Sequence, residues 1–285
     1  MNIGIVGMGL IGGSFCKALS KFTSHKVYGK NRSQAVMEKA EKEGSIVGRI
    51  SDDNIGDMDL IIVALSPAAA REEMEKVCGK LKDGTLVIDI VGNKTSMVEK
   101  MNELAKKYPK LEFISTHPMA GKECSGYDNA TDTMFVGASA LLVPVHASAT
   151  TVAALTELFK SMGFSIVKVT TADEHDRIIA YTSQLAHVIS SCYVNTPLAE
   201  KQVGFSAGSF KDLSRVAKMN VDMWTELFLE NSAYLCEVLD DLIVRLSKMS
   251  ETIKSGDKEK LASILQQGND MKIKVDALKN VDGKK

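Results

Sequence analysis

Short apolar runs, separated by stretches with helical spacing, make up the first 170 residues of the chain. Residues 1–7 form the first apolar run, apolar residues recur at helical spacing over 13–22, and a second run follows at 25–29. Runs of this length predict buried strands and the spacing between them predicts a helix, so this segment is expected to form a strand–helix–strand unit. Further strand-like runs lie at residues 59–65, 85–91, 112–115, 139–145 and 164–170. The pattern predicts a doubly wound α/β sheet.

The pattern changes after residue 170. Long amphipathic stretches rich in Leu, Ala, Met, Glu and Lys continue almost to the end of the chain, with Gly204, Gly208 and Gly256 as the main interruptions. Such stretches predict an all-helical second half. We therefore expect two domains, an α/β domain over residues 1–170 and a helical domain over residues 171–285. The last residues, 280–285, are expected to fray.

Composition and charge narrow the class of protein. Hydrophobic residues make up 45% of the 285 residues and charged residues 25%, which is the balance of a globular protein that folds throughout. The formal net charge of −1 does not supply the attraction to phosphates that nucleic-acid binding needs, so no nucleic-acid partner is expected. The apolar start of the chain is broken by glycine and lacks a basic leader, so neither a signal peptide nor a membrane span is expected.

The five cysteines are odd in number, scattered and free of C-x-x-C pairs. This usage argues against both a disulfide framework and a metal site. We therefore expect a cytoplasmic protein that holds no metal.

A glycine-rich turn follows the first predicted strand. Residues 7–12 read Gly-Met-Gly-Leu-Ile-Gly, a G-x-G-x-x-G pattern between a strand and a helix. The first glycine permits the tight turn, the second lets the backbone approach a pyrophosphate, and the third allows close helix packing. In this context the pattern predicts a Rossmann-type dinucleotide-binding domain, and the alternative is an ordinary glycine-rich turn without a ligand. The cofactor contacts are assigned to Gly7, Gly9, Leu10, Ile11 and Gly12, and to Ala64, Leu65 and Ser66 at the end of the strand predicted at residues 59–65.

The end of the second strand bears on which dinucleotide binds. An Asp or Glu there would hydrogen-bond the adenosine ribose and favour NAD, but the chain reads Lys30-Asn31-Arg32-Ser33. Asn31, Arg32 and Ser33 can instead hold a 2′-phosphate, with the guanidinium pairing with the dianion. We therefore expect NADP. The alternative is that the basic residues are solvated loop charges while NAD binds through backbone contacts.

A histidine follows the strand predicted at residues 112–115. Residues 115–127 read Ser-Thr-His-Pro-Met-Ala-Gly-Lys-Glu-Cys-Ser-Gly-Tyr, which places His117 in a predicted loop bounded by proline and glycines. Such a loop lies at the carboxyl end of the sheet, where ligands of open α/β folds bind. A histidine there can act as a general base that takes an alcohol proton as hydride leaves the same carbon. The alternative is a loop histidine that only hydrogen-bonds the backbone.

A second histidine, His187, falls on the first predicted helix of the second domain, one turn after Ser183. Taken alone, a helical histidine is more often a core residue than a functional one.

Three motifs resemble those of the prephenate and arogenate dehydrogenases of tyrosine biosynthesis. Residues 115–126 match the family's S-x-H-P-[IM]-A-G-x-E-x-S-G almost throughout. Residues 183–187 match S-x-L-P-H, with alanine in place of the proline. Residues 210–217, which read Phe-Lys-Asp-Leu-Ser-Arg-Val-Ala, and Trp224 match the third motif. The three motifs occur in the family's order and span most of the chain.

The resemblance implies an activity and a set of site residues. Members of the family oxidise prephenate with NAD(P)⁺, and loss of the ring carboxylate as carbon dioxide gives 4-hydroxyphenylpyruvate without a metal. The resemblance implies that His117 is the catalytic base at the C4 hydroxyl and that Arg215 pairs with a substrate carboxylate. It also implies a homodimer formed through the helical domain. The further substrate contacts that it implies are Ser183, His187, Asp212 and Trp224.

The chain departs from the family's pattern at two positions. Gly92 stands where many relatives have the serine of D-x-G-S-x-K, so a serine contact to His117 or to the substrate is not available there. Lys122 stands where Thr or Ser is common, and its ammonium group either contacts a substrate carboxylate or points to solvent.

Three alternatives remain open on the sequence. No residue distinguishes prephenate from arogenate as the substrate. A β-hydroxyacid dehydrogenase shares the order of a nucleotide domain followed by helices, although it would use a catalytic lysine in the helical domain. A non-catalytic sensor that binds NAD(P) is the third alternative.

Overall fold

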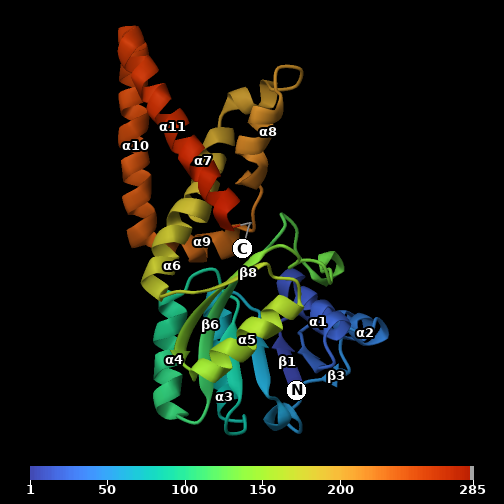
Figure 1. Ribbon diagram of the computed structural model, residues 1–285. Coiled ribbons are helices and arrows are strands. Elements are labelled where there is room, and N and C mark those ends of the chain that lie inside the picture. The colour runs from blue at the N-terminus through green and yellow to red at the C-terminus, as the bar shows by residue number, and fades with distance from the viewer. Residues whose placement is uncertain (283–285) are drawn as a thin grey trace. The chain divides into compact units, whose positions relative to one another are not determined.

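An eight-stranded sheet with the order β3-β2-β1-β4-β5-β6-β7-β8 forms the centre of the first part of the chain (Figure 1). The structure is a computed structural model that describes residues 1–282, with side chains up to residue 278. The six strands from β3 to β6 in this order run parallel, β7 is antiparallel to β6, and β8 is parallel to β7. The strands are β1 (Asn2–Val6), β2 (Lys26–Lys30), β3 (Gly48–Arg49), β4 (Leu60–Val63), β5 (Leu86–Asp89), β6 (Glu112–Met119), β7 (Ser139–His146) and β8 (Ile166–Val169).

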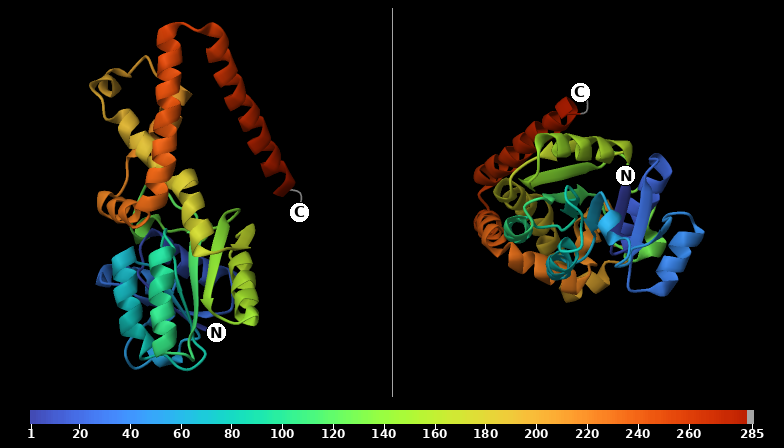
Figure 2. Two further views of the ribbon diagram at one scale, coloured as in Figure 1. Left: turned by 90° about the vertical axis from the view of Figure 1, so that its left-hand side faces the viewer. Right: turned by 90° about the horizontal axis from the view of Figure 1, so that it is seen from below.

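Helices cover both faces of the sheet (Figure 2). Ile3 and Ile5 of β1 pack into one apolar cluster with residues of α1, α2 and α5, whereas Val6 belongs to the opposite cluster with residues of α3 and α4. Because both faces are buried, the strands are continuous apolar runs, which is why they can be predicted from the sequence. These helices are α1 (Leu10–Phe22), α2 (Gln34–Lys42), α3 (Pro67–Cys78), α4 (Thr95–Lys107) and α5 (Ala149–Ser161).

The predicted doubly wound sheet is confirmed, and each predicted strand lies within a few residues of an observed one. The short strand β3 was not predicted, because two residues leave no hydrophobic period to read.

The placement of His117 in a loop was wrong, because the residue lies inside β6. Pairing with β5 ends at Ser115, but pairing with the antiparallel strand β7 continues to Met119 and matches His117 with Leu141. The last part of β6 therefore has one unpaired edge, and a strand with a free edge tolerates a proline such as Pro118. The histidine is consequently held by a strand that extends beyond the carboxyl end of its neighbour.

Helices follow from residue 172 onward, as predicted. The helix α6 (Ala172–Ile179) continues through a π-helical turn (Ala180–Gln184) into α7 (Leu185–Val194). The later helices are α8 (Gly208–Ser214), α9 (Val221–Glu230), α10 (Ser232–Ser255) and α11 (Lys258–Asp282), and short 3₁₀ turns lie at Ile55–Asp57, Tyr127–Asn129, Pro197–Lys201 and Arg215–Ala217. Among the described residues, no helix combines the length and the apolar character that crossing a membrane requires.

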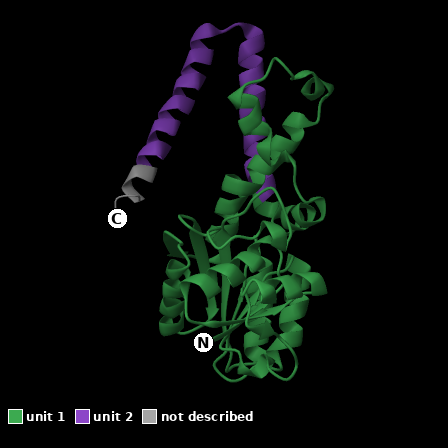
Figure 3. Cartoon of the chain, turned by 90° about the vertical axis from the view of Figure 1, so that its right-hand side faces the viewer, with its two compact units in different colours: residues 1–234 green, residues 235–285 purple. Residues whose placement is uncertain are grey.

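The chain divides into two compact units, Met1–Tyr234 and Leu235–Lys285 (Figure 3). The second unit contains most of α10 and all of α11, two helices that diverge from their connection near Gly256. Of the tail expected to fray, residues 280–282 continue α11, while 283–285 lie outside the described residues.

Candidate active site

The glycine turn has the geometry that a dinucleotide needs. Gly7 has φ of 91°, and a Cβ atom there would lie 2.3 Å from the carbonyl oxygen of Ala64. A Cβ atom at Gly12 would lie 1.9 Å from the carbonyl oxygen of Gly7, so neither position accepts a side chain. A Cβ atom at Gly9 would instead meet nothing within 4 Å. The space above Gly9 is therefore open at the point where a pyrophosphate would approach the backbone.

The first turn of α1 lies beside this space. The helix begins at Leu10, followed by Ile11, and its N-cap residue Gly9 makes no side-chain cap hydrogen bond. The first backbone N–H groups of the helix and the positive end of its dipole are consequently available to an anion. Ala64 and Leu65, which directly follow β4, line the same turn through their contacts with Gly7, and Ser66 is the N-cap residue of α3. The residues present thus fit a dinucleotide.

The loop after β2 has one side chain free for a further anion. The Asn31 Oδ1 atom accepts a hydrogen bond from the backbone N–H of Met8 at 3.2 Å, so Asn31 fastens the glycine turn. The Ser33 hydroxyl caps α2 by accepting from the Val36 N–H at 3.4 Å. Lys30 pairs with Glu73 at 2.6 Å. Arg32 is exposed and has no hydrogen bond or ion pair within the described part of the chain.

His117 is linked to a residue that the sequence did not single out. Its Nδ1 atom lies 2.9 Å from the Nε2 atom of His175, which belongs to α6. The Nδ1 atom of His175 lies in turn 2.7 Å from the Oδ1 atom of Asp176. His117, His175 and Asp176 therefore form a hydrogen-bonded chain from the end of β6 into the first helix after residue 170.

Asp176 is fixed by the N-terminus of α4. Its Oδ1 atom accepts from the backbone N–H of Lys94 at 2.8 Å, and its Oδ2 atom accepts from the backbone N–H of Thr95 at 2.8 Å and from the Thr95 hydroxyl at 2.6 Å. Lys94 is the N-cap residue of α4 and provides no side-chain cap. A carboxylate at this end of a helix is stabilised by the helix dipole. Asp176 thus supplies from another element the cap that α4 lacks.

The buried ammonium group of Lys94 links β5 to the part of β6 that precedes His117. Its Nζ atom donates to the Oδ2 atom of Asp89 at 2.5 Å and to the carbonyl oxygen of Thr116 at 2.6 Å. The Ser115 hydroxyl donates to the other carboxylate oxygen of Asp89 at 2.5 Å. These bonds tie β6 to the ends of β5 and α4 and fix the backbone on the N-terminal side of His117.

Burial sets the protonation of these groups. Burial lowers the pKa of His117 well below its usual value of 6.5, and nearby His175 and Lys94 lower it further. Burial also lowers the pKa of His175, although the hydrogen bond to Asp176 opposes this. The pKa of Asp176 is lowered despite burial, because His175, Thr95 and Lys94 donate hydrogen bonds to its carboxylate. The hydrogen-bonded group therefore consists of two neutral histidines, His117 and His175, and the ionised carboxylate of Asp176.

A buried amide network joins the helices after residue 170 to the loop after β5. The side chain of Asn93 donates to the Leu227 carbonyl oxygen at 2.8 Å, Gln184 donates to Asn93 at 2.9 Å, and Asn231 donates to Gln184 at 2.8 Å. Gln184 lies in the π-helical turn, a feature that is frequent at functional sites. Because buried amides are costly without partners, this network fixes the turn that also carries Ser183.

A second group of predicted site residues gathers around His187. The ring of His187 stacks on Trp224 with centroids 3.7 Å apart, and its Nδ1–H donates to the Ser183 carbonyl oxygen at 3.0 Å. Arg215 forms an ion pair with Glu123, which lies in the segment that follows His117. Burial lowers the pKa of His187, and the charge of Arg215 contributes to this. The structure thus brings together His187, Trp224, Arg215 and the carbonyl group of Ser183.

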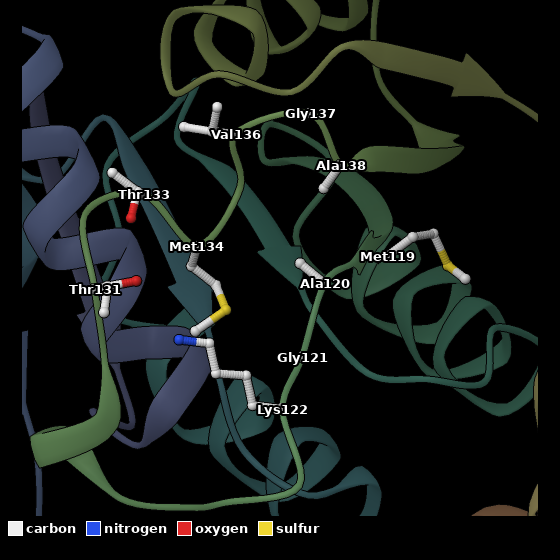
Figure 4. A pocket seen from close by; sticks show the side chains of 10 residues that line it. All are labelled: Met119, Ala120, Gly121, Lys122, Thr131, Thr133, Met134, Val136, Gly137 and Ala138. Carbon is white, nitrogen blue, oxygen red and sulfur yellow. The ribbon is translucent and has the colours of Figure 1, made fainter. Parts of the chain in front are cut away.

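Two other predicted residues are more exposed. Asp212 lies on the surface of α8. Lys122 lines an open pocket of about 420 Å³ that begins two residues after His117, and its side chain extends toward Met134 (Figure 4). The lining residues of this pocket are Met119, Ala120, Gly121, Lys122, Thr131, Thr133, Met134, Val136, Gly137 and Ala138.

Gly92 lies against Leu227. A Cβ atom at this position would lie 3.3 Å from the Leu227 Cδ2 atom, so a serine would crowd that side chain.

The sequence offered one signal for the residues it missed. Asp176 lies three and four positions before Ile179 and Ala180, which are both buried, so it stands on the apolar face of an amphipathic helix. A carboxylate at such a position predicts a buried partner. Its partners Thr95 and Lys94 lie 81 and 82 residues earlier in the chain, which no local pattern reveals.

The fold and the site define a class. A dinucleotide turn at the carboxyl edge of a parallel sheet, together with a neutral, half-buried histidine at the same edge, is the arrangement of a dinucleotide-dependent dehydrogenase.

Comparisons with known proteins narrow the class. The family model described as "Prephenate dehydrogenase, nucleotide-binding domain" matches residues 15–168, and the model described as "Prephenate dehydrogenase, dimerization domain" matches residues 171–267. The chain belongs to the prephenate dehydrogenase family and is an oxidoreductase.

Individual relatives agree with this assignment. The chain is 28% identical to the prephenate dehydrogenase of Lactococcus lactis over 275 residues, which cover 93% of this chain and 74% of that protein. It is 27% identical to the cyclohexadienyl dehydrogenase of Zymomonas mobilis over 274 residues, which cover 91% of each. The crystal structure of Synechocystis arogenate dehydrogenase has a TM-score of 0.82 at 25% identity, covering 96% of this chain and 100% of that one.

Proposed function

We propose that the chain catalyses the oxidative decarboxylation of prephenate to 4-hydroxyphenylpyruvate, with a nicotinamide cofactor as hydride acceptor. The observation that carries the proposal is the placement of His117, whose Nδ1 atom is engaged by His175 at 2.9 Å and whose burial keeps the ring neutral. Such a ring has its Nε2 atom available as a base. Membership in the prephenate dehydrogenase family supports the substrate class.

His117 is the proposed catalytic base at the C4 hydroxyl of the substrate. When bound, the nicotinamide accepts the hydride that leaves C4. The Nε2 atom of His117 takes the hydroxyl proton as C4 becomes a carbonyl carbon. The bond between the ring and its carboxylate then breaks, the electron pair enters the ring as carbon dioxide departs, and His117 returns the proton to the phenolate oxygen. Formation of the aromatic ring makes the sequence effectively irreversible.

The remaining site residues are proposed to hold the substrate. Prephenate carries two carboxylates, and the fork of Arg215 suits bidentate pairing with one of them. The substrate carboxylate would then replace Glu123, which occupies the guanidinium now. Further contacts are proposed for the side chains of Ser183, His187, Asp212, Trp224 and Lys122.

The cofactor is proposed to be NADP. Supporting this, Arg32 is exposed and unpaired within the described residues, whereas Lys30 is neutralised by Glu73. No carboxylate stands between Lys30 and Ser33 to bind an adenosine ribose as NAD would require. The 2′-phosphate contact therefore rests chiefly on Arg32, since Asn31 and Ser33 already have backbone partners.

The chain is further proposed to act as a homodimer through a helical domain that begins at residue 171. The match of residues 171–267 to a dimerization domain supports this proposal. So do the exposed apolar side chains after residue 171, among which Phe205, in the turn before α8, is 93% exposed. Large apolar side chains exposed in such number are typical of an interaction surface. Sedimentation at micromolar concentration tests the proposal, and a monomeric mass would contradict it.

Arogenate is the second candidate substrate, because the chain is similar over nearly all of its length to an arogenate dehydrogenase. The purified protein is to be assayed spectrophotometrically with prephenate and with arogenate, each with NADP⁺ and with NAD⁺. We expect the largest kcat/KM with prephenate and NADP⁺. Absence of turnover with both acids and both cofactors would refute the proposed function.

A further inference from the structure

We propose that His175 and Asp176 are positioning residues for the reaction, which hold His117 in the tautomer whose Nε2 atom accepts a proton. The proposal rests on the proposed function for its catalytic consequence. Its structural core, the tautomer of His117, is testable without any substrate.

The tautomers follow from the hydrogen bonds of Asp176. Its two carboxylate oxygens accept from three donors of Lys94 and Thr95, all within 2.8 Å. A carboxylate surrounded by donors is ionised and can only accept. The Nδ1 atom of His175, 2.7 Å from the carboxylate, must therefore carry a hydrogen and donate it.

The tautomer of His175 determines the tautomer of His117. A neutral imidazole with hydrogen on Nδ1 has a bare Nε2 atom, which accepts. The Nε2 atom of His175 lies 2.9 Å from the Nδ1 atom of His117, so that Nδ1 atom must donate. The Nε2 atom of His117 is then the bare nitrogen. Each hydrogen position in the chain is fixed by the carboxylate at its end.

Among the groups around His117, the hydrogen-bonded His175 and Asp176 are the ones that can stabilise a positive charge on its ring. The charged or titratable groups that act on the ring are His175 and Asp176 of α6 and Lys94 at the start of α4. The ammonium of Lys94 disfavours a proton on His117, and it is bound to Asp89 at 2.5 Å. Asp176 is the group that favours the proton, and it acts through the ring of His175. With glycine at position 92, no serine hydroxyl is available from that position for the task.

The reaction requires no proton transfer from His117 to His175 or Asp176. His117 gains the substrate's hydroxyl proton on Nε2, keeps its Nδ1 hydrogen in the bond to His175, and later returns the Nε2 proton to the phenolate oxygen. Asp176 stays ionised throughout and stabilises the transient imidazolium, as in other carboxylate-oriented histidines.

The tautomer is read by NMR of the full-length protein labelled with ¹⁵N-histidine. The chain has five histidines, and single His→Gln variants assign their signals. Near neutral pH we expect His117 and His175 both to carry hydrogen on Nδ1. A His117 ring protonated on Nε2 and bare on Nδ1 would overturn the proposal, whatever the activity of the enzyme.

Steady-state kinetics tests whether His175 contributes to catalysis. His175→Ala is expected to lower kcat by about a hundredfold, the size of a general-base contribution, with the KM of both substrates changed by no more than about twofold. His175→Gln keeps an oxygen that can accept from His117 and is expected to recover part of kcat. His146→Gln is the matched control, because His146 is exposed and its Nε2 atom bonds the Pro109 carbonyl oxygen.

The possible results distinguish a failure of the positioning role of His175 from a failure of the proposed function. A His175→Ala variant that keeps kcat within about twofold of wild type, while His117→Ala is inactive, contradicts the positioning role alone. If His175→Ala does not fold, the comparison of His175→Gln with wild type and the tautomer of the wild-type protein decide. If the wild-type protein turns over neither acid, the proposed function fails and the tautomer measurement still decides whether the chain of hydrogen bonds orients His117.

Discussion

Asp176 accepts hydrogen bonds from both the backbone N–H and the hydroxyl of Thr95, 81 residues earlier in the chain, at 2.8 and 2.6 Å. The first helix after residue 170 is thereby fastened to the N-terminus of α4 in the nucleotide-binding part of the fold. This bond has consequences for stability as well as for the orientation of His117.

Replacing Asp176 by alanine is expected to destabilise the protein strongly. The change leaves the buried N–H of Lys94 and the ring N–H of His175 without an acceptor, and each unsatisfied buried donor costs about 1–3 kcal/mol. We expect the free energy of unfolding in urea, followed by circular dichroism, to fall by about 3 kcal/mol or more. Asp83→Ala is the control, because its pair with Lys110 is exposed and worth less than about 1 kcal/mol. Equal effects of the two substitutions would contradict the assigned role of Asp176.

Stability is expected to fall as the pH drops below about 6.5, the ordinary pKa of histidine. The pKa values of His117 and His175 are lowered in the folded state, so below that pH the unfolded chain binds protons that the folded protein does not. The free energy of unfolding therefore rises with pH up to about 6.5, by as much as about 1.4 kcal/mol per pH unit for each ring, and these two groups add no slope above it.

Urea midpoints measured between about pH 5 and 8 check this dependence. His175→Gln should flatten the slope below pH 6.5, whereas His146→Gln should leave it unchanged. A slope that is the same in wild type and in His175→Gln would show that His175 is not held neutral by the fold.

Arg215→Ala is expected to raise KM for the substrate with a smaller effect on kcat. A charge-assisted hydrogen bond contributes about 1.5–3 kcal/mol, which corresponds to roughly ten- to hundredfold in KM. Glu123→Gln removes the carboxylate that now pairs with Arg215, so it should lower KM. Arg215→Lys keeps the charge without the fork and should fall between wild type and Arg215→Ala. Unchanged KM in Arg215→Ala would remove Arg215 from the substrate site.

Arg32→Ala is expected to lower kcat/KM for NADP⁺ by about tenfold or more and to leave that for NAD⁺ nearly unchanged, because only NADP⁺ carries the 2′-phosphate. Lys26→Ala removes the same charge at the other end of β2 and serves as the control. A parallel loss with both cofactors, or no loss with either, would count against NADP as the physiological cofactor.

The sequence predicted the sheet, the glycine turn and the helical second half because each is a local pattern. Gly12 is required by its contact with the Gly7 carbonyl oxygen within one strand–turn–helix unit, and the spacing of the glycines locates the turn. His117 was predicted as a site residue but misplaced, since the pairing of β6 with β7 depends on a strand that begins some twenty residues later.

The supports of His117 were not predictable in the same way. His175 and Asp176 lie 58 and 59 residues after His117, and their relation to it exists only once α6 packs against the start of α4. Likewise Asn31 and Ser33 fit a phosphate by residue type, yet in the structure their side chains bind backbone groups. Residue type identifies what a side chain can bind, whereas the competing partners are decided by tertiary packing.

The most direct test of the account is the steady-state and binding analysis of His117→Ala beside wild type. If His117 is the base, kcat should fall by about 10²- to 10⁴-fold while the Kd of the cofactor, measured by fluorescence titration, stays within about twofold of wild type. Turnover near the wild-type rate in His117→Ala would contradict the central claim that this histidine performs the proton transfer.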